Sequence, residues 1–290
     1  MRGIAILNGF KVVDGVNYVF DRMKEELAIY NIGLDKTTTA EAYALVNGDS
    51  INAIDGYDFV LFLDKDVYTS LALEKAGMRL FNNAKAIWLC DDKMITHLTL
   101  ANNGIKMPKT IAGPLNYSSE TCDRFIERVM EELEFPLVAK KSFGSLGRNV
   151  FLVKDKEELI EWEHENRFES RLYQEFISSS FGFDYRLIVI GGRFLVGMKR
   201  ENTMGDFRSN IALGGEGVKA DIPQSFIEMA EKCAKLLDLD YCGVDLLSGP
   251  NGEPILCEVN SNAFMAGIEK VTGVNVAGAF AKHIYNEMSK

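Results

Sequence analysis

Short apolar runs and amphipathic segments alternate over the first part of the chain. Residues 4–7 and 59–63 are continuous apolar runs, which are typical of buried strands in a parallel sheet. Residues 16–30 and 67–76 have apolar positions at helical spacing, so each segment predicts an amphipathic helix. The order strand, helix, strand, helix predicts a small α/β lobe of the βαβ type over residues 1–85.

The pattern changes near residue 86, where we place the junction between the first lobe and the next. A helix is predicted to open at residues 91–93 and to end at Gly104, with Pro108 soon after it. This compact element separates the first lobe from a second lobe, which we place over residues 86–178.

A glycine-rich segment at residues 142–149 lies between two predicted strands. The first strand covers residues 136–139 and runs into Lys140, and the second covers residues 150–153. The segment matches neither the GxxxxGK[ST] Walker pattern, which opens a helix, nor the GxGxxG dinucleotide pattern. Lys140 beside exposed backbone N–H groups suits a phosphate, but a lysine at a strand end also fits an ordinary solvated surface.

The last third of the chain, residues 179–290, predicts an α+β lobe. Apolar runs flank Gly191 and Gly192 at a spacing typical of a β-hairpin. Residues 224–237 have the period of an amphipathic helix. Two further strand patterns, residues 242–247 and 254–259, are joined by a Gly-Pro-Asn-Gly turn and are expected to pair as neighbours.

The composition is that of an ordinary globular protein. The chain has 290 residues, of which 47% are apolar and 26% are charged, and its formal net charge is −10. The negative charge disfavours broad attraction to nucleic acid or to an anionic membrane. Since no apolar run approaches roughly 20 residues and the start leads directly into a strand, we expect a cytoplasmic protein without a membrane partner.

The cysteines, histidines and serines give no sign of a disulfide framework, a zinc site or a hydrolase triad. Five cysteines, without a CxxC pair, are expected to be buried, reduced thiols. The three histidines lack metal-ligand spacing and are expected to be structural or solvated. Ser142 and Ser145 lack a GxSxG elbow.

The acidic side chains of the last two strands form the most informative group. If these strands pair about their turn, Asp245, Glu258 and Asn260 can converge, and Glu258 and Asn260 share one strand face. Two carboxylates and an amide are hard oxygen ligands that suit Mg²⁺ bound to nucleotide phosphates. A solvated strand face is the alternative, but both acids lie inside apolar runs, where an unpaired charge is costly.

Two other segments have polar groups that suit an anionic nucleotide. Residues 206–210 include Arg208 and lie just after Arg200, and two guanidiniums suit a phosphate or carboxylate, although a charged surface loop is the alternative. Residues 174–177 could offer backbone groups to an adenine edge, with Glu175 accepting from a ribose hydroxyl. As a tetrapeptide alone, this second segment is weak.

Taken in order, these pieces resemble the ATP-grasp superfamily, and within it the ribosomal-protein-modifying α-L-glutamate ligase family. The resemblance covers roughly residues 88–286. Each motif alone occurs in unrelated chains, whereas six in order are specific. The matching motifs are Asp92-Lys93 with residues 104–108; residues 138–140 with 144–147; residues 174–177 with Asp184 and Arg186; residues 205–210 with 214–215; residues 243–247; and residues 258–260 with 267–269, 272–273 and 277–278.

The resemblance implies a role for each of these residues. It implies an ATP-grasp fold with an amino-terminal pre-ATP-grasp lobe, and ATP between the central and carboxy-terminal lobes. By the same resemblance Asp245, Glu258 and Asn260 hold two Mg²⁺ or Mn²⁺ ions. The implied nucleotide contacts are Lys93 and Lys140 with Gly144, Ser145 and Gly147 at the phosphates, Glu175, Phe176 and Ile177 at adenine and ribose, Asp184 near ribose, and Arg208, Ser209 and Asn210 at the phosphate end.

The chain departs from the family pattern after Asn260. The glutamate ligases usually continue with a small residue and Ser-Pro-Gly, whereas this chain has Ser261, Asn262, Ala263 and Phe264. In the family this stretch faces the acceptor. We therefore expect Asn262 and Phe264 to shape an acceptor pocket here, with packing of Phe264 into the core as the alternative.

The resulting hypothesis is an ATP-dependent carboxylate–amine ligase that forms an amide through an acyl phosphate. Arg200 and Arg208 are the candidates for stabilising that intermediate. The substrates are a carboxylate and an amine, such as glutamate or another amino acid joined to a small molecule or a peptide terminus. Phosphorylation without ligation and a non-catalytic nucleotide-binding module are the alternatives, and the sequence leaves open a monomer or a homo-oligomer.

Overall fold

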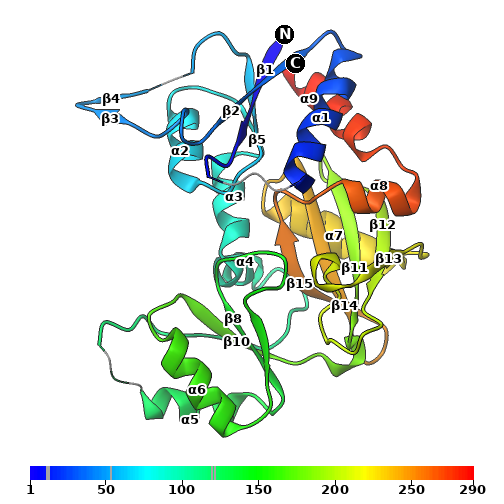
Figure 1. Cartoon of the computed structure of the whole chain (residues 1–290). Coiled ribbons are helices and arrows are strands. Elements are labelled where there is room, and N and C mark those ends of the chain that lie inside the picture. Colours follow the sequence, from blue (N-terminus) through cyan, green and yellow to red (C-terminus); the bar gives the residue numbers. More distant parts are fainter. Residues whose placement is uncertain (11–13, 53, 119, 121) are drawn as a thin grey trace.

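The computed structural model describes residues 1–10, 14–52, 54–118, 120 and 122–290, and its elements form three groups (Figure 1). The amino-terminal group and the carboxy-terminal group pack against each other, and the central group lies apart from the amino-terminal sheet. We use the terms amino-terminal, central and carboxy-terminal lobe for these groups. The predicted limits at residues 85 and 178 stay predictions.

The amino-terminal lobe is a parallel sheet of order β2-β1-β5-β6, with a small hairpin, β3-β4, projecting from it. The two predicted strands and two predicted helices are confirmed. The sequence pattern missed β2 because only Leu34 of that strand is buried, so no apolar run marks it. The elements are β1 (Arg2–Leu7), α1 (Asp14–Ala28), β2 (Gly33–Thr38), β3 (Val46–Asn47), β4 (Ser50–Ile51), β5 (Phe59–Phe62), α2 (Val67–Lys75), β6 (Leu80–Phe81) and α3 (Ala84–Asp91).

The segment that joins the first two lobes differs from its prediction at one end. Helix α4 (Lys93–Leu100) begins after Asp92, whose carboxylate accepts from the backbone nitrogens of Met94 and Ile95 at 2.8 and 3.1 Å. The helix ends at Leu100 rather than at Gly104. Asn102 already has a left-handed φ of 62°, which a continuing α-helix cannot accommodate.

The central lobe is an antiparallel sheet of order β7-β10-β8-β9 with two helices on one face. Trp162 and Tyr173 lie in the core between the sheet and these helices. The predicted glycine-rich turn between β8 and β9 is confirmed. The elements are β7 (Thr110–Ala112), α5 (Asp123–Glu132), β8 (Leu137–Lys141), β9 (Val150–Val153), α6 (Lys156–Asn166) and β10 (Arg171–Glu175).

The carboxy-terminal lobe is an antiparallel sheet of order β13-β12-β11-β14-β15, and both predicted hairpins are present in it. Helix α7 packs on one face, and α8 lies on the side of the amino-terminal lobe. The elements are η1 (Ser178–Ser180), β11 (Phe183–Ile190), β12 (Arg193–Glu201), η2 (Ile211–Leu213), β13 (Glu216–Val218), α7 (Gln224–Leu236), β14 (Tyr241–Ser248), β15 (Pro254–Asn260), α8 (Ala266–Thr272) and α9 (Val276–Met288).

One hydrophobic core is shared by the amino-terminal and carboxy-terminal lobes. Helix α1 packs on α9, and Met23 of α1 shares a buried cluster with Met265 and Phe280 of the carboxy-terminal lobe. Burying these apolar surfaces against each other stabilises the contact between the lobes. The amino-terminal lobe is therefore fixed beside the end of β15, where the predicted metal ligands lie.

The cysteine prediction is right for three residues and wrong for one. Cys90, Cys233 and Cys242 are buried, and all five cysteines are free thiols. Cys257 is partly buried, and burial raises the pKa of its thiol to about 11. Cys122 is exposed because it precedes α5, at the outer end of the central lobe.

Candidate functional site

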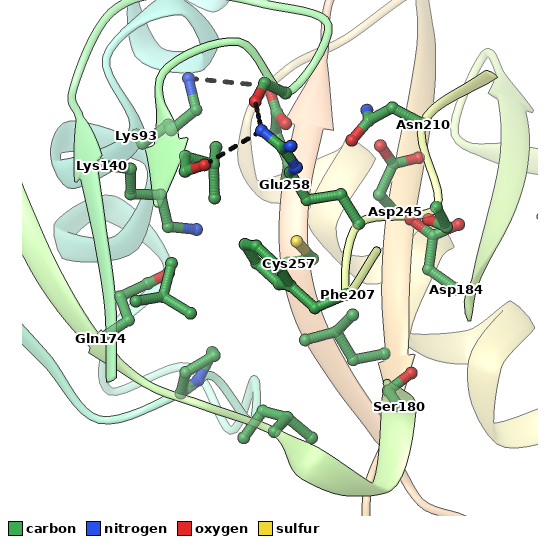
Figure 2. Close-up of a pocket in the computed structure, with 18 of the residues that line it drawn as sticks. Lys93, Lys140, Gln174, Ser180, Asp184, Phe207, Asn210, Asp245, Cys257 and Glu258 are labelled. Atoms are coloured by element: carbon green, nitrogen blue, oxygen red, sulfur yellow. Dashed lines mark hydrogen bonds and ion pairs between the residues drawn. The ribbon is translucent and has the colours of Figure 1, made fainter. Parts of the chain in front are cut away.

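A cavity of about 110 Å³ lies between the central and carboxy-terminal lobes (Figure 2). Lys140 and Gln174 lie on one side of it, and Phe207, Asp184 and Asp245 lie on the other. Nearly all the predicted site residues line this one cavity. Those that do are Lys93, Lys140, Gly144, Ser145, Gly147, Glu175, Phe176, Ile177, Asp184, Arg200, Arg208, Ser209, Asn210, Asp245 and Glu258.

The three predicted metal ligands converge through the pairing of β14 with β15. Asp245 is directly opposite Glu258 in this ladder, and the register shifts just after Asp245. Asn260 donates its side-chain amide to Asp245 at 3.4 Å. The amide oxygen of Asn260 and the carboxylates of Asp245 and Glu258 thus form a set of hard oxygen donors, which fits Mg²⁺ or Mn²⁺.

Two arginines bind the buried carboxylate of Asp245. Arg186 donates to both of its oxygens, at 2.8 and 2.7 Å, and Arg200 lies 3.0 Å from one of them. Burial alone would raise the pKa of this carboxyl, but the two guanidiniums outweigh burial and lower it. Asp245 therefore stays ionised, as a metal ligand must be. Arg186 belongs to a matching motif but had no predicted role.

Arg200 is not a free cation in the cavity. Its guanidinium is 2% exposed and forms ion pairs with Asp184 and Asp245. The Asp184 carboxylate, predicted near a ribose, is itself occupied by Arg200. Burial alone would lower the pKa of Arg200, but its two carboxylate partners outweigh burial and raise the pKa above its usual value. The guanidinium is therefore always charged.

Two buried lysines provide positive charge on the opposite side of the cavity. Lys93 donates to the carbonyl of Gly144 at 2.9 Å and lies 3.9 Å from a carboxylate oxygen of Glu258. Burial lowers the pKa of Lys93, and the nearby Glu258 carboxylate offsets this effect in part. Lys140 lines the cavity from β8 and is 6% exposed. Both positions suit the phosphates of a nucleotide.

The glycine-rich loop touches the residues after β12. Arg208 donates to the carbonyls of Gly147 and Val150 at 3.0 and 3.2 Å, while its other nitrogens bind Asp206. Gly147 has a left-handed φ of 71°, and a Cβ there would lie 2.5 Å from Asn210. Only glycine permits this close approach of the two lobes.

The lower end of the cavity has an aromatic wall that sequence reasoning missed in part. The ring of Phe176 lies edge-on to Phe181 and Phe207, with centroids 6.2 and 6.0 Å apart. Phe207 lies within a predicted segment, but only its neighbours Arg208, Ser209 and Asn210 had been given roles. Glu175 is exposed and accepts from the backbone nitrogen of Lys109 at 3.2 Å. An apolar slot of this kind suits a flat heterocyclic base.

A second cavity of about 510 Å³ adjoins the first on the side of the amino-terminal lobe. The two cavities share Ser145, Arg200, Asn210 and Glu258. Asn260, Asn262 and Phe264 line the second cavity and not the first, and Phe264 is partly exposed. Its ring packs on Gly15, where a Cβ would lie 2.9 Å from the ring.

Residues of the amino-terminal lobe also line the second cavity, and sequence reasoning had assigned them no role. Asn8 follows β1, and Asp64 and Lys65 follow β5. The carboxyl ends of parallel strands commonly form ligand sites, so their positions directly after two buried strands were the available signal. Asn8 donates to Asp64 at 3.1 Å.

Comparison with known proteins agrees with this geometry. Residues 90–284 match the RimK-like ATP-grasp domain. Human beta-citrylglutamate synthase B is 35% identical over 223 residues, 76% of this chain and 56% of that protein. A probable alpha-L-glutamate ligase of Maridesulfovibrio salexigens is 35% identical over 214 residues, which are 73% of this chain and 68% of that protein. The chain spans little more than half the length of the human protein.

The fold agrees as well. The crystal structure of a RimK-domain ATP-grasp protein from Sphaerobacter thermophilus superposes with a TM-score of 0.72 at 20% identity, over 97% of this chain and 98% of that one. The predicted ATP-grasp fold is thus confirmed. Of the helices in the described ranges, none is long and apolar enough to cross a membrane. The chain belongs to the RimK-like ATP-grasp family.

Proposed function

We propose that the chain is an ATP-dependent carboxylate–amine ligase that forms an amide through an acyl phosphate. The observation that supports this proposal is that two cavities meet over Glu258 and Asn210. The narrower one has lysines and an aromatic slot that suit ATP, and the wider one has room for two further substrates. A γ-phosphate at the junction would face a substrate carboxylate in the second cavity.

The donor set of Asp245, Glu258 and Asn260 would hold one or two divalent ions, Mg²⁺ or Mn²⁺. A bound ion supplies charge neutralisation at the phosphate oxygens. The protein's own residues orient these ligands, because Arg186 and Arg200 fix the Asp245 carboxylate by charge-assisted hydrogen bonds. Arg200 therefore contributes through Asp245 as a positioning residue.

The lysines and Arg208 would bind the nucleotide and close the loop over it. Lys93 and Lys140 line the cavity, where they would contact the phosphates. Arg208 donates a hydrogen bond to the carbonyl of Gly147 across the cavity. In the reaction, a carboxylate oxygen of one substrate attacks the γ-phosphorus and ADP leaves. The amine of the second substrate then attacks the acyl carbon, phosphate leaves, and the ammonium proton is lost to solvent. Binding and charge stabilisation suffice, without a protein nucleophile.

The substrates are proposed by class. Glutamate or another amino acid would be joined to a small molecule or to a peptide terminus, since relatives carry the names beta-citrylglutamate synthase B and probable alpha-L-glutamate ligase. The net charge of −10 disfavours nucleic acid and anionic membrane as partners. The proposed location is the cytoplasm. A homo-oligomer is compatible with this proposal.

The test is a panel of amino acids and carboxylates incubated with ATP and Mg²⁺, with ADP and phosphate measured and products identified by mass spectrometry. A ligase gives ADP, phosphate and a new amide in equal amounts. ADP with a phosphorylated product and no amide would support a kinase instead. Nucleotide binding without ADP formation in any pair would support a binding module.

A further inference from the structure

A series of hydrogen bonds links α4, β10 and β7 beside the first cavity. The ring nitrogen Nδ1 of His97 lies 2.7 Å from the carbonyl of Lys93, and Nε2 lies 2.9 Å from the amide nitrogen of Gln174. The same amide nitrogen donates to the hydroxyl of Thr110 at 2.8 Å. His97 and Gln174 are both buried, with exposed fractions of 4% and 2%.

Only one placement of the hydrogen atoms satisfies all of these hydrogen bonds. A carbonyl can only accept, so Nδ1 of His97 must have the proton. Burial, together with the nearby lysine charges, lowers the pKa of His97 to about 4, so the ring is neutral and Nε2 accepts from Gln174. The Thr110 hydroxyl donates to the carbonyl of Pro108 at 2.8 Å and so receives the second amide hydrogen of Gln174.

These hydrogen bonds determine which atom Gln174 offers to a ligand. Both hydrogens of its amide are used by His97 and Thr110, so its carbonyl oxygen is the group that remains. Gln174 points from the same face of the sheet as Val138 and Lys140, toward the cavity, which all three line (Figure 2). Turning the amide over would set its oxygen against the lone pair of His97 and leave a buried donor unpaired, which is costly.

We propose that Gln174 is a specificity-determining residue for the nucleotide base and that His97 is the residue that positions it. The fixed carbonyl oxygen accepts from the exocyclic amine of adenine. Guanine and hypoxanthine have a carbonyl at the equivalent position, so they meet an acceptor that cannot rotate into a donor. This inference rests on the proposed nucleotide function of the cavity.

The test compares the dissociation constants of ADP and IDP, which differ in the 6-amino and 6-oxo groups, with Mg²⁺ present, by calorimetry on the full chain. We expect ADP to bind at least roughly tenfold tighter than IDP. In Gln174→Met, which keeps the volume and removes the acceptor, the ratio should fall to within about threefold, mainly through weaker ADP binding. An unchanged ratio in this variant overturns the proposal.

Two substitutions at His97 separate positioning from packing. His97→Leu removes the acceptor, so Gln174 is free to turn and the ADP preference should fall as in Gln174→Met. His97→Gln provides an acceptor near the position of Nε2 and should restore the preference, whatever its melting temperature. Restoration by glutamine but not by leucine supports the proposal, because a packing role would not change the ratio of two ligands.

The matched control is Thr99→Val on the same helix, whose hydroxyl donates only to the carbonyl of Ile95. This variant should keep the wild-type ratio. Equal affinity of the wild type for ADP and IDP overturns the inference about Gln174 and leaves the nucleotide cavity intact. Failure of the wild type to bind either nucleotide would overturn the proposed function as well.

Discussion

The guanidinium of Arg186 binds both carboxylate oxygens of Asp245, at 2.8 and 2.7 Å, on the face of the carboxy-terminal sheet that lines the two cavities. Asp245 therefore has a structural task besides its proposed task as a ligand. It compensates the charge of Arg186 and, together with Asp184, that of Arg200. Two predictions separate these tasks.

Asp245→Asn should lower the free energy of unfolding by about 3 kcal/mol, because it leaves two largely buried guanidiniums with less negative charge. Urea unfolding of the variant and the wild type measures this difference without any ligand. Asp206→Asn is the control, since Asp206 pairs with the more exposed Arg208. An equal loss of unfolding free energy in the two variants would show that the buried ion pairs of Asp245 stabilise the fold no more than the exposed pair of Asp206.

Glu258→Gln should reduce ADP and product formation by roughly 100-fold or more, because it removes a metal-neutralising charge and little volume. Its free energy of unfolding should stay within about 1 kcal/mol of the wild type, since the ion pair of Glu258 with Lys93 is long, at 3.9 Å. Turnover within a fewfold of the wild type at ordinary Mg²⁺ would mean that Glu258 is not a ligand.

The glycine-rich loop, residues 144–147, should gain protection from amide exchange when Mg²⁺ and a non-hydrolysable ATP analogue bind. Lys93 and Arg208 donate hydrogen bonds to carbonyls of the loop, and the phosphates of a bound nucleotide would add acceptors for its N–H groups. The turn at Gly191 and Gly192 is the internal control and should not change. Equal loop protection with and without the analogue would contradict a phosphate-covering role.

Phe264→Ala should change the relative kcat/KM values of competing acceptors by about tenfold while the Kd of ATP stays nearly constant. The ring lines the second cavity beside Asn262 and packs on Gly15 of the amino-terminal lobe. Phe168→Ala, at an exposed position, is the control for loss of an aromatic ring. A uniform loss for all acceptors with a lower Tm would show that Phe264 is a core residue.

Acidification should destabilise the wild type more than His97→Gln. The folded pKa of His97 is about 4, below its unfolded value of 6.5, so the unfolded state binds the proton first as the pH falls. Above pH 6.5 the neutral ring makes its full contribution to the free energy of unfolding. Between pH 6.5 and 4 this contribution falls by about 3 kcal/mol. In urea unfolding at pH 7, 5.5 and 4, the difference in unfolding free energy between the wild type and His97→Gln should become smaller as the pH falls. A constant difference would refute the shifted pKa.

Much of the fold and the site could be predicted because the information is local. Residues 59–63 and 254–259 are apolar enough to mark buried strands, and the Gly-Pro-Asn-Gly turn fixes that the last two strands pair. Once they pair, the period of two places Glu258 and Asn260 on one face, next to Asp245. Polar elements such as β2 escaped because packing on β1, rather than their own pattern, makes them strands.

The sequence by itself determined the order of the elements, the glycine-rich turn between β8 and β9, and the residue types that meet at the cavity. Only the tertiary structure decided which charges are already paired, since Arg186 reaches Asp245 from the neighbouring strand β11 and Arg200 from β12, one strand further. It also decided that Asn8 and Asp64 border the second cavity and that His97 fixes Gln174. Pairing and orientation depend on distances between segments far apart in the chain, and no local pattern encodes those distances.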